Sequence, residues 1–369
     1  MKFTCEKSQL VSAISVASRT VAQKSAIAGL EGILVRAGVK VMLTGYNLET
    51  GITVGLEAQV EEDGACIMPA RLFFDIVRKL PDETVSVQVD AGYRVSIRGG
   101  ISAFTITALT AEDYPELPDV DSEKGIRVPQ CELKAMISGT SFAVSENQAR
   151  PIHTGILFEI DEESITSVAV DGYRLALRRY VPEEKLERKV KFVAPAAALR
   201  EVEKILGDTD EPATFYPGSK HILFSIGDAT LVCRILEGEF LDWRRVLPQN
   251  NPIRLVGNVS QLTDSIERVG LVVSEKLKSP VRCRFRDNSA EFRTVSTIGE
   301  AYDVCPIAGD GKDLEIGFNC KYLLDALRAV PDSECTLEMV NGLSPIVLNP
   351  CTGNRYSYMV LPVRLKAGE

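Results

Sequence analysis

A threefold internal repeat constrains the fold of this sequence more than any other feature. Three twelve-residue stretches align at offsets of 126 and 124 residues, about a third of the chain: "PARLFFDIVRKL" (69–80), "PAAALREVEKIL" (195–206) and "NCKYLLDALRAV" (319–330). Each starts with a proline expected in the first turn of a helix or an asparagine expected as its cap, and continues with apolar residues at helical spacing. Each then runs into a turn and a strand-like stretch. The sequence therefore predicts one structural unit used three times.

The segments that precede these helices repeat as well. "LTGYNLETGI" (43–52) and "AVDGYRLALR" (169–178) are interpreted as the same hairpin, with Gly45 aligned to Gly172. An earlier helix in each unit is expected to begin near Lys7, Cys131 and Ser260. We therefore expect an α+β protein of three similar domains, each with two helices and roughly eight antiparallel strands. The expected boundaries are 1–120, 126–248 and 252–369. A single large α+β domain is the alternative.

The sequence offers few side chains for catalysis. Its two histidines, His153 and His221, lack metal-ligand spacing, and the common phosphate-loop, zinc-protease and serine-nucleophile motifs are missing. The nine cysteines are scattered without a CxxC pair, and no run of about 18 apolar residues occurs. These features predict a reduced, cytoplasmic protein with mostly buried thiols and with no metal or cofactor. An enzyme that uses carboxylates alone stays open, because the chain has 51 Asp and Glu residues.

Charge is distributed unevenly between the helices and the rest of the chain. Opposite the apolar stripes lie Arg71, Asp75 and Arg78, then Ala197, Glu201 and Lys204, then Lys321, Asp325 and Arg328. The six predicted helical segments sum to +5, whereas the whole chain carries −9 at pH 7. Helices that are less acidic than the body are compatible with a polyanion on the helical side. Ordinary solvated helix faces are the alternative reading.

Helix width sets the size of any ring that these helices could line. At about 10 Å per helix, six helices give a circumference of ~60 Å and a hole of roughly 9 Å. Twelve helices give a circumference of ~120 Å and a hole of roughly 28 Å. A DNA duplex is roughly 20 Å across. One chain is therefore too small to surround a duplex, whereas a dimer is large enough and leaves space for water.

Several segments spread over the whole chain have a specific resemblance. They are "MKFTCEK", "LTGYNLE", "PARLFFDIVRKLPDE", "TAEDYPELPD", "GILFEI", "VAVDGYRLAL", "FLDWRRVLPQNNP", "LEIGFNCKYLLDAL" and "YMVLPVRL". Together they resemble the bacterial sliding clamp family, the beta subunit of DNA polymerase III, from Met1 to Leu365. The resemblance implies the DNA-clamp fold and a head-to-tail homodimeric ring of six similar domains, with helices lining the hole and sheets outside.

The function that this resemblance implies is not catalytic. The ring would encircle duplex DNA without sequence preference as a processivity factor. It would tether the DNA polymerase III alpha subunit, the clamp loader, other polymerases and repair proteins. The alternatives are a three-domain protein-binding scaffold that never encircles DNA, and the carboxylate-based enzyme.

The resemblance also implies a peptide pocket between the second and third domains. Its matching residues are Val170, Gly172, Tyr173, Arg174, Leu175, Leu241, Arg245, Val246, Met359, Val360, Leu361, Pro362, Val363 and Arg364. Partners would bring a short linear motif with Leu and Phe anchors. We expect an exposed apolar cleft lined by Leu175, Val246, Val360 and Leu361.

Three arginines of this set are expected at the rim of the cleft: Arg174, Arg245 and Arg364. The apolar stretch "YSYMVLPVRL" (356–365) would then be half core strand and half binding wall, rather than a strand that only fills a core. Pro362 would suit a strand edge, where no ladder donor is needed. His153 stands where many relatives have an apolar pocket residue, and Leu241 stands where many have proline.

Two further sets of residues follow from the resemblance and the helix faces. The residues expected to face DNA are Lys24, Arg71, Arg78, Asn147, Gln148 and Arg150. Ala196 and Ala197 stand where relatives often have basic residues, which predicts a weaker DNA contact in the second domain. The dimer contact is expected to join Phe104 and Ile106 to Val272 and Val273, with a sheet edge paired across subunits.

Overall fold

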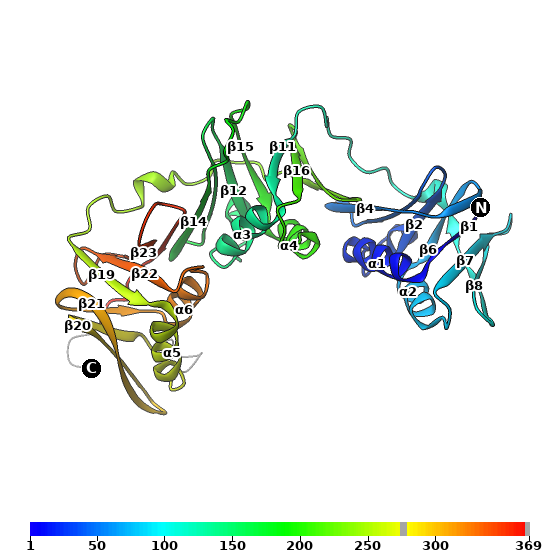
Figure 1. The fold of residues 1–369 in the computed structure, drawn as a ribbon. Helices are drawn as coiled ribbons and strands as arrows, with labels where there is room; N and C mark the ends of the chain where they lie inside the picture. Colours follow the sequence, from blue (N-terminus) through cyan, green and yellow to red (C-terminus); the bar gives the residue numbers. More distant parts are fainter. Residues whose placement is uncertain (274–278, 366–369) are drawn as a thin grey trace. The chain divides into compact units, whose positions relative to one another are not determined.

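The computed structural model describes residues 1–273 and 279–365 (Figure 1). These residues fold as two compact units. One unit comprises residues 1–133 and 197–235, and the other comprises residues 134–196 and those from 236 onward. Residues 366–369 of the third predicted domain, and 274–278 within it, lie outside the described residues. No helix in the described ranges is both long enough and apolar enough to cross a membrane. All nine cysteines are free thiols, and seven of them are buried, as predicted.

The six predicted helices are present in the described part of the chain. They are α1 (Lys7–Ala17), α2 (Ala70–Lys79), α3 (Gln130–Ser141), α4 (Ala196–Ile205), α5 (Val259–Gly270) and α6 (Cys320–Arg328). The predicted apolar stripes are buried, since Phe73 of α2, Val202 of α4 and Leu323 of α6 are each at most 3% exposed. Helical periodicity therefore placed α2, α4 and α6, and the repeat placed the starts of α1, α3 and α5 to within one residue.

The prolines before α2 and α4 occupy a different position from the one predicted. Pro69 and Pro195 are the last residues of strands β6 (Gly64–Pro69) and β15 (Val190–Pro195), so the prediction of a first-turn proline is wrong. Each strand leads directly into its helix. A proline is tolerated at the end of a ladder because few backbone donors are needed there. Asn319 does cap α6 as predicted, because its Oδ1 accepts the backbone N–H of Tyr322 at 3.2 Å.

The strands follow the helices in a similar order three times. The first repeat has β1 (Lys2–Glu6), β2 (Gly32–Ala37), β3 (Val41–Tyr46), β4 (Thr50–Leu56), β5 (Gln59–Glu62), β6, β7 (Thr84–Val89), β8 (Arg94–Gly99), β9 (Ser102–Thr107) and β10 (Leu109–Thr110). The second has β11 (Ile126–Pro129), β12 (Gly155–Ile160), β13 (Ile165–Val170), β14 (Arg174–Tyr180), β15, β16 (Pro212–Pro217), β17 (His221–Ile226) and β18 (Ala229–Arg234). The third has β19 (Ile253–Asn258), the long β20 (Val281–Ser296) and β21 (Gly299–Phe318), β22 (Glu334–Met339), β23 (Ile346–Pro350) and β24 (Tyr356–Val360).

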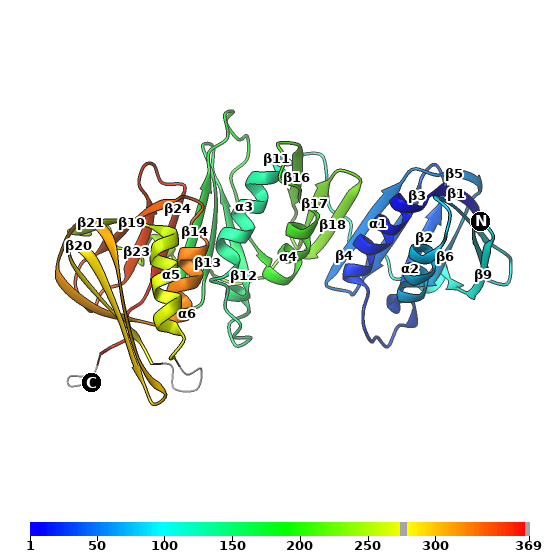
Figure 2. The same cartoon turned by 60° about the horizontal axis from the view of Figure 1, so that its bottom comes forward.

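These strands form three sheets among the described residues. Their orders are β5-β1-β7-β8-β9, β10-β6-β2-β3-β4-β18-β17-β16-β11 and β15-β12-β13-β14-β24-β23-β22-β19-β21-β20. Two antiparallel junctions connect strands of neighbouring repeats: β4 pairs with β18, and β14 pairs with β24 (Figure 2). The sheets therefore continue from one repeat into the next.

The two predicted hairpins exist, but the predicted alignment between them is wrong by three residues. In the turn after β3, the Asn47 Oδ1 accepts two backbone N–H groups, and Asp171 Oδ1 does the same after β13. Asn47 therefore corresponds to Asp171, and Leu48 corresponds to Gly172. Both Leu48 (φ 72°) and Gly172 (φ 92°) have positive φ. Gly45 instead lies inside β3, so matching glycine to glycine misled the alignment.

Candidate partner, DNA and assembly sites

A tight turn between β13 and β14 presents one group of the predicted pocket residues. The Asp171 side chain accepts the backbone N–H groups of Tyr173 at 2.8 Å and Arg174 at 3.0 Å, which fixes the turn. Tyr173 is left 61% exposed at its tip. The Tyr173 carbonyl accepts the backbone N–H of Leu361 at 2.9 Å, so this turn and the end of β24 are joined. The structure therefore brings the 170–175 and 359–364 segments together.

A hydrophobic cluster lies beneath this surface. Val170, Leu175 and Met359 belong to it and are at most 6% exposed. Val246 is partly buried and packs against the same cluster, so the 241–246 segment joins the other two. Predicted pocket residues from three distant parts of the sequence thus meet around one apolar floor.

Three of the predicted pocket residues are more deeply buried than the sequence indicated. Leu175 and Val360 are fully buried, so they support the surface from below and do not line an open cleft. Arg174 is only 8% exposed, and its placement at the rim is wrong. Its guanidinium donates to carboxylates of Asp171 and Asp325, and the latter partner could not be identified from sequence spacing. Arg245 is exposed as predicted and pairs with Asp242 at 3.0 Å.

The end of the chain changes from core strand to exposed segment at Leu361. Residues Tyr358, Met359 and Val360 are buried in β24, whereas Leu361 and Val363 are each 36% exposed. Beyond Leu361 the chain leaves β14, and the Val363 N–H donates to the carbonyl of Gly317 in β21 at 2.8 Å. Pro362, which has no N–H, stands between these two donors, so its ring removes no hydrogen bond.

His153 lies beside the apolar floor. Its ring meets the Phe240 ring edge to face, with centroids 5.2 Å apart, and Phe240 belongs to the buried cluster. The Nε2 atom is buried and has no hydrogen-bond partner among the described residues. Burial lowers the pKa of His153, and the nearby Arg150 cation lowers it further. The imidazole is therefore neutral at pH 7 and acts mainly as an apolar wall.

Sequence reasoning missed the contribution of α6 to this surface. The Tyr322 ring stacks on Tyr173 with a centroid distance of 5.8 Å, and Arg174 lies over the Tyr322 ring at 4.4 Å. Asp325, one helical turn further along α6, accepts from Arg174. The repeated helix "NCKYLLDAL" is visible in the sequence, but its charge pattern predicts either a surface for DNA or an ordinary solvated face, and not a contact with the partner surface.

The predicted DNA residues fall on two equivalent loops and on α2. Lys24 lies eight residues before β2, and Asn147 lies eight residues before β12, so the two occupy the same place in successive repeats. Lys24, Asn147, Gln148 and Arg150 are all exposed. The Asn147 Oδ1 accepts the Ala149 N–H at 3.0 Å, which orders the second loop. Both loops are therefore accessible to a polyanion.

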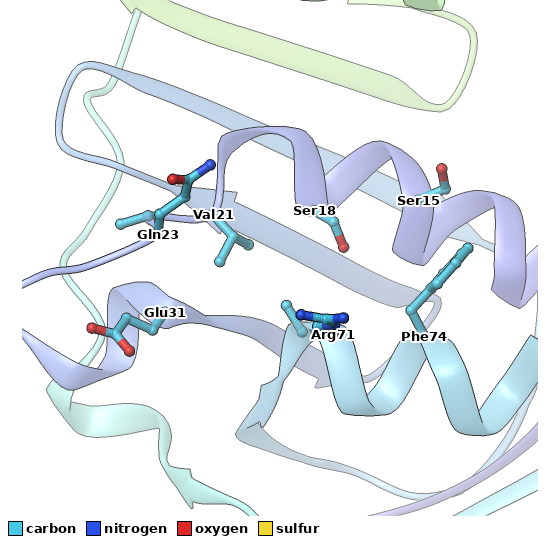
Figure 3. Close-up of a pocket in the computed structure, with 9 residues that line it drawn as sticks. Ser15, Ser18, Val21, Gln23, Glu31, Arg71 and Phe74 are labelled. Carbon is cyan, nitrogen blue, oxygen red and sulfur yellow. The ribbon is translucent and has the colours of Figure 1, made fainter.

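Arg71 stands at a depression of about 600 Å³ on the helical side of the first repeat. In Figure 3, Ser15 and Ser18 lie on the α1 side of this depression, and Arg71 and Phe74 lie on the α2 side. Within the described residues Arg71 has no ion-pair partner, and the buried Ser18 Oγ has no hydrogen-bond partner. Glu31 also lines the depression. An unpaired guanidinium beside free hydroxyls is suited to a phosphate group.

Several charges on the predicted helix faces are engaged within the protein. Asp325 pairs with Arg174, and Arg328 pairs with Glu267 of α5 at 2.6 Å, so these side chains are not simply solvated. Arg78 lies 3.5 Å from Asp75. In the second repeat Ala196 is buried and only Ala197 is exposed. A basic residue could therefore face outward at position 197 but not at 196.

Two of the predicted dimer residues lie on a strand edge that carries no further strand, and the other two lie beside the turn that begins a second such edge. Phe104 and Ile106 are on β9, the last strand of the five-stranded sheet, and Phe104 is 40% exposed. Val272 and Val273 are half-buried after α5, and the Val272 carbonyl accepts the Ser296 hydroxyl at 2.6 Å, beside the turn between β20 and β21. In the described part of the chain, residues 299–306 of β21 pair with β20 on one side only.

Comparison with known proteins finds matches along nearly the whole chain. The N-terminal, central and C-terminal domains of the DNA polymerase III beta subunit match residues 1–118, 127–242 and 244–364. The beta sliding clamp of Staphylococcus epidermidis is 30% identical over 99% of both chains, and that of Staphylococcus aureus is 29% identical over the same shares. The crystal structure of the Bacillus subtilis DNA polymerase sliding clamp has a TM-score of 0.94 at 29% identity, covering 99% of this chain and 100% of that one. The chain has three similar domains of this fold and belongs to the DNA polymerase III beta subunit family, the bacterial sliding clamps.

Proposed function

We propose that this chain is a non-catalytic processivity factor in the cytoplasm, which encircles duplex DNA as a head-to-tail dimer and tethers replication and repair proteins. The observation that supports this most directly is the match to the family along the full length, with the same three domains in the same order. The pattern of sheet junctions supports the ring.

The two junctions inside the chain predict how a ring closes. The last strand of the second repeat, β18, pairs with β4, and the last strand of the third, β24, pairs with β14. The strand in the first repeat that corresponds to β18 and β24 is β9, which is an open edge. Residues 299–306 of β21 follow β20 through a tight turn, as β4 follows β3, so they correspond to β4. Their edge away from β20 carries no further strand among the described residues. We therefore place the dimer joint between β9 and residues 299–306 of two chains, formed twice in the ring.

Encirclement is tested by comparing how well the protein is retained on circular and on linear DNA. The protein is loaded on nicked circular DNA by a clamp loader, and retention after a high-salt wash is compared before and after the circle is cut. We expect retention on the circle and rapid loss from the linear form, because a closed ring slides off a free end. Equal loss from both forms would favour the scaffold or the enzyme.

Direct DNA contacts are proposed for the Lys24 and 147–150 loops and for Arg71. Replacing Lys24 and Arg150 by alanine should lower the slope of log K against log salt by about 1 for each phosphate that is no longer neutralised. The slope is measured by fluorescence anisotropy with a short duplex. Lys185→Ala with Lys189→Ala, in the loop between β14 and β15, provides a matched control that should leave the slope unchanged. A slope equal to wild type would remove Lys24 and Arg150 from the DNA-facing set.

Partner proteins are proposed to bind the surface formed by Tyr173, Leu241, Val246, Leu361 and Val363. Exposed apolar side chains over a buried floor suit an extended peptide with Leu and Phe anchors. The DNA polymerase III alpha subunit and the clamp loader would each bring such a motif. Other polymerases and repair proteins would compete for the same surface.

A further inference from the structure

Arg174 lies beneath the proposed partner surface and is held by two carboxylates and two aromatic rings. Its Nε donates to Asp171 Oδ2 at 2.9 Å and its Nη1 donates to Asp325 Oδ2 at 2.6 Å. The guanidinium lies over the rings of Tyr322 at 4.4 Å and Phe142 at 5.5 Å. Its side chain is 9% exposed. A cation this well enclosed has little surface left with which to contact a partner.

The two carboxylates that hold Arg174 come from different parts of the chain. Asp171 belongs to the turn that carries Tyr173, and it is 11% exposed. Asp325 belongs to α6 of the third repeat, 151 residues away from Arg174, and it is 21% exposed. Charged hydrogen bonds with this little solvent are stronger and more directional than exposed pairs. The Arg174–Asp325 bond therefore attaches the turn of the second repeat to a helix of the third.

A second contact between the same two elements lies beside the first. Tyr322, three residues before Asp325 on α6, stacks on Tyr173 with centroids 5.8 Å apart. The Tyr173 carbonyl in turn accepts the Leu361 N–H at 2.9 Å. α6 also packs on β24, since the Tyr358 hydroxyl donates to the Ala329 carbonyl at 3.1 Å. The exposed Tyr173 and Leu361 side chains are therefore held in one arrangement by α6.

We propose that Asp325 and Tyr322 of α6 are positioning residues for the partner surface. They act through Arg174 and Tyr173 and set the spacing of Tyr173 and Leu361. This inference rests on the proposed peptide-binding function. It assigns Arg174 a supporting role, in which the guanidinium locks the turn before any partner arrives. The surface is then preorganised, and a peptide does not bear the entropy cost of ordering it.

Loss of either positioning residue should weaken peptide binding without abolishing the dimer. Asp325→Ala leaves Arg174 with one carboxylate and frees the turn from α6. We expect the Kd of a Gln-Leu-x-Leu-Phe-like peptide to rise about tenfold, because binding must then bear the cost of ordering the turn and its side chains. Tyr322→Leu keeps the apolar packing but removes the stacking, and should raise the Kd by a smaller factor. Asp325→Glu retains the carboxylate and should restore part of the affinity.

The matched control is an ion pair at the N-terminal end of β24, which is the end farther from the turn. Asp332 pairs with Arg355 and accepts the Tyr356 hydroxyl at 3.2 Å, and its side chain is 25% exposed. Asp332, which precedes β22, contacts the start of β24, so Asp332→Ala removes a comparable carboxylate at a distance from the turn. Both alanine variants should lower the melting temperature, but only Asp325→Ala should raise the peptide Kd by more than twofold. This difference separates positioning from general stabilisation.

The experiment is a fluorescence anisotropy titration of the labelled peptide into each full-length dimer, with melting temperatures measured in parallel. A tenfold rise for Asp325→Ala, with the control near wild type, would support the inference. Unchanged affinity in folded Asp325→Ala and Tyr322→Leu dimers would overturn it. If Asp325→Ala fails to fold, Asp325→Asn and Tyr322→Leu decide the question by the same criterion. Failure of the wild-type dimer to bind the peptide would instead contradict the proposed function itself.

Discussion

Replacing both Val272 and Val273 by alanine is expected to convert the dimer into a folded monomer at low micromolar concentration. Each truncation removes half-buried methyl groups and should cost about 1 kcal/mol. With two valines at each of two joints, the ring loses about 4 kcal/mol, which corresponds to a roughly thousandfold rise in the dimer Kd. The measurement is sedimentation velocity over a concentration series.

The fold of the subunit should survive this change. The Val272 carbonyl, and not its side chain, accepts the Ser296 hydroxyl, so the local hydrogen bond stays. Phe104→Ala on β9 should have the same effect from the other side of the joint. Val39→Ala with Val181→Ala is a matched control, since Val39 is fully exposed and Val181 is 61% exposed, and both lie away from the two edges. A double variant that dimerises like wild type would place the joint elsewhere.

Leu361→Asp is expected to abolish partner-peptide binding while leaving the ring intact. Leu361 is 36% exposed, so the carboxylate can reach water without unfolding the chain, and the backbone N–H still donates to Tyr173. A peptide carrying Leu and Phe anchors should bind wild type with a Kd near 1 μM, about −8 kcal/mol. A charge in the apolar contact should raise that Kd at least a hundredfold, because the anchor would be buried against an ion.

The readout is calorimetric titration, with sedimentation to confirm the dimer. Val181→Asp places the same charge on an exposed valine after β14 and should bind peptide normally. Changing the peptide's Leu and Phe to Ala should remove binding to wild type as well. Peptide affinity that is unaffected by Leu361→Asp would show that partners dock on another surface.

Periodicity placed the second helix of each repeat well because α2, α4 and α6 each bury one apolar stripe. The hairpin alignment failed for a specific reason: Leu48 takes a positive φ that glycine usually takes, so glycine spacing did not mark the turn. Pro69 and Pro195 were predicted in the first turn of a helix, but each is the last residue of the preceding strand. The sequence could not separate the two positions, because both tolerate proline. Local pattern therefore located the elements more reliably than the residues between them.

The candidate partner surface shows what sequence cannot supply. The resemblance gathered Val170, Leu175, Val246 and Met359, and the structure does place them in or against one cluster. The prediction that Arg174 is exposed was wrong. Its partner Asp325 lies far along the chain, and no local pattern links the two residues. A segment can be recognised from its amino-acid sequence alone. The burial and ion pairing of its side chains depend on tertiary contacts, which the sequence pattern does not give.

The sheet junctions at β4–β18 and β14–β24 determine whether one repeat can fold by itself. A fragment cut to the central match, residues 127–242, would keep β17 beside β18 and β13 beside β14 but would lose β4 and β24, the partners on their other edges. Bare strand edges of this kind recruit strands from other molecules, so such a fragment should aggregate rather than fold alone. We therefore expect autonomous folding only from larger pieces of the chain that keep both sides of each junction, as the two compact units do.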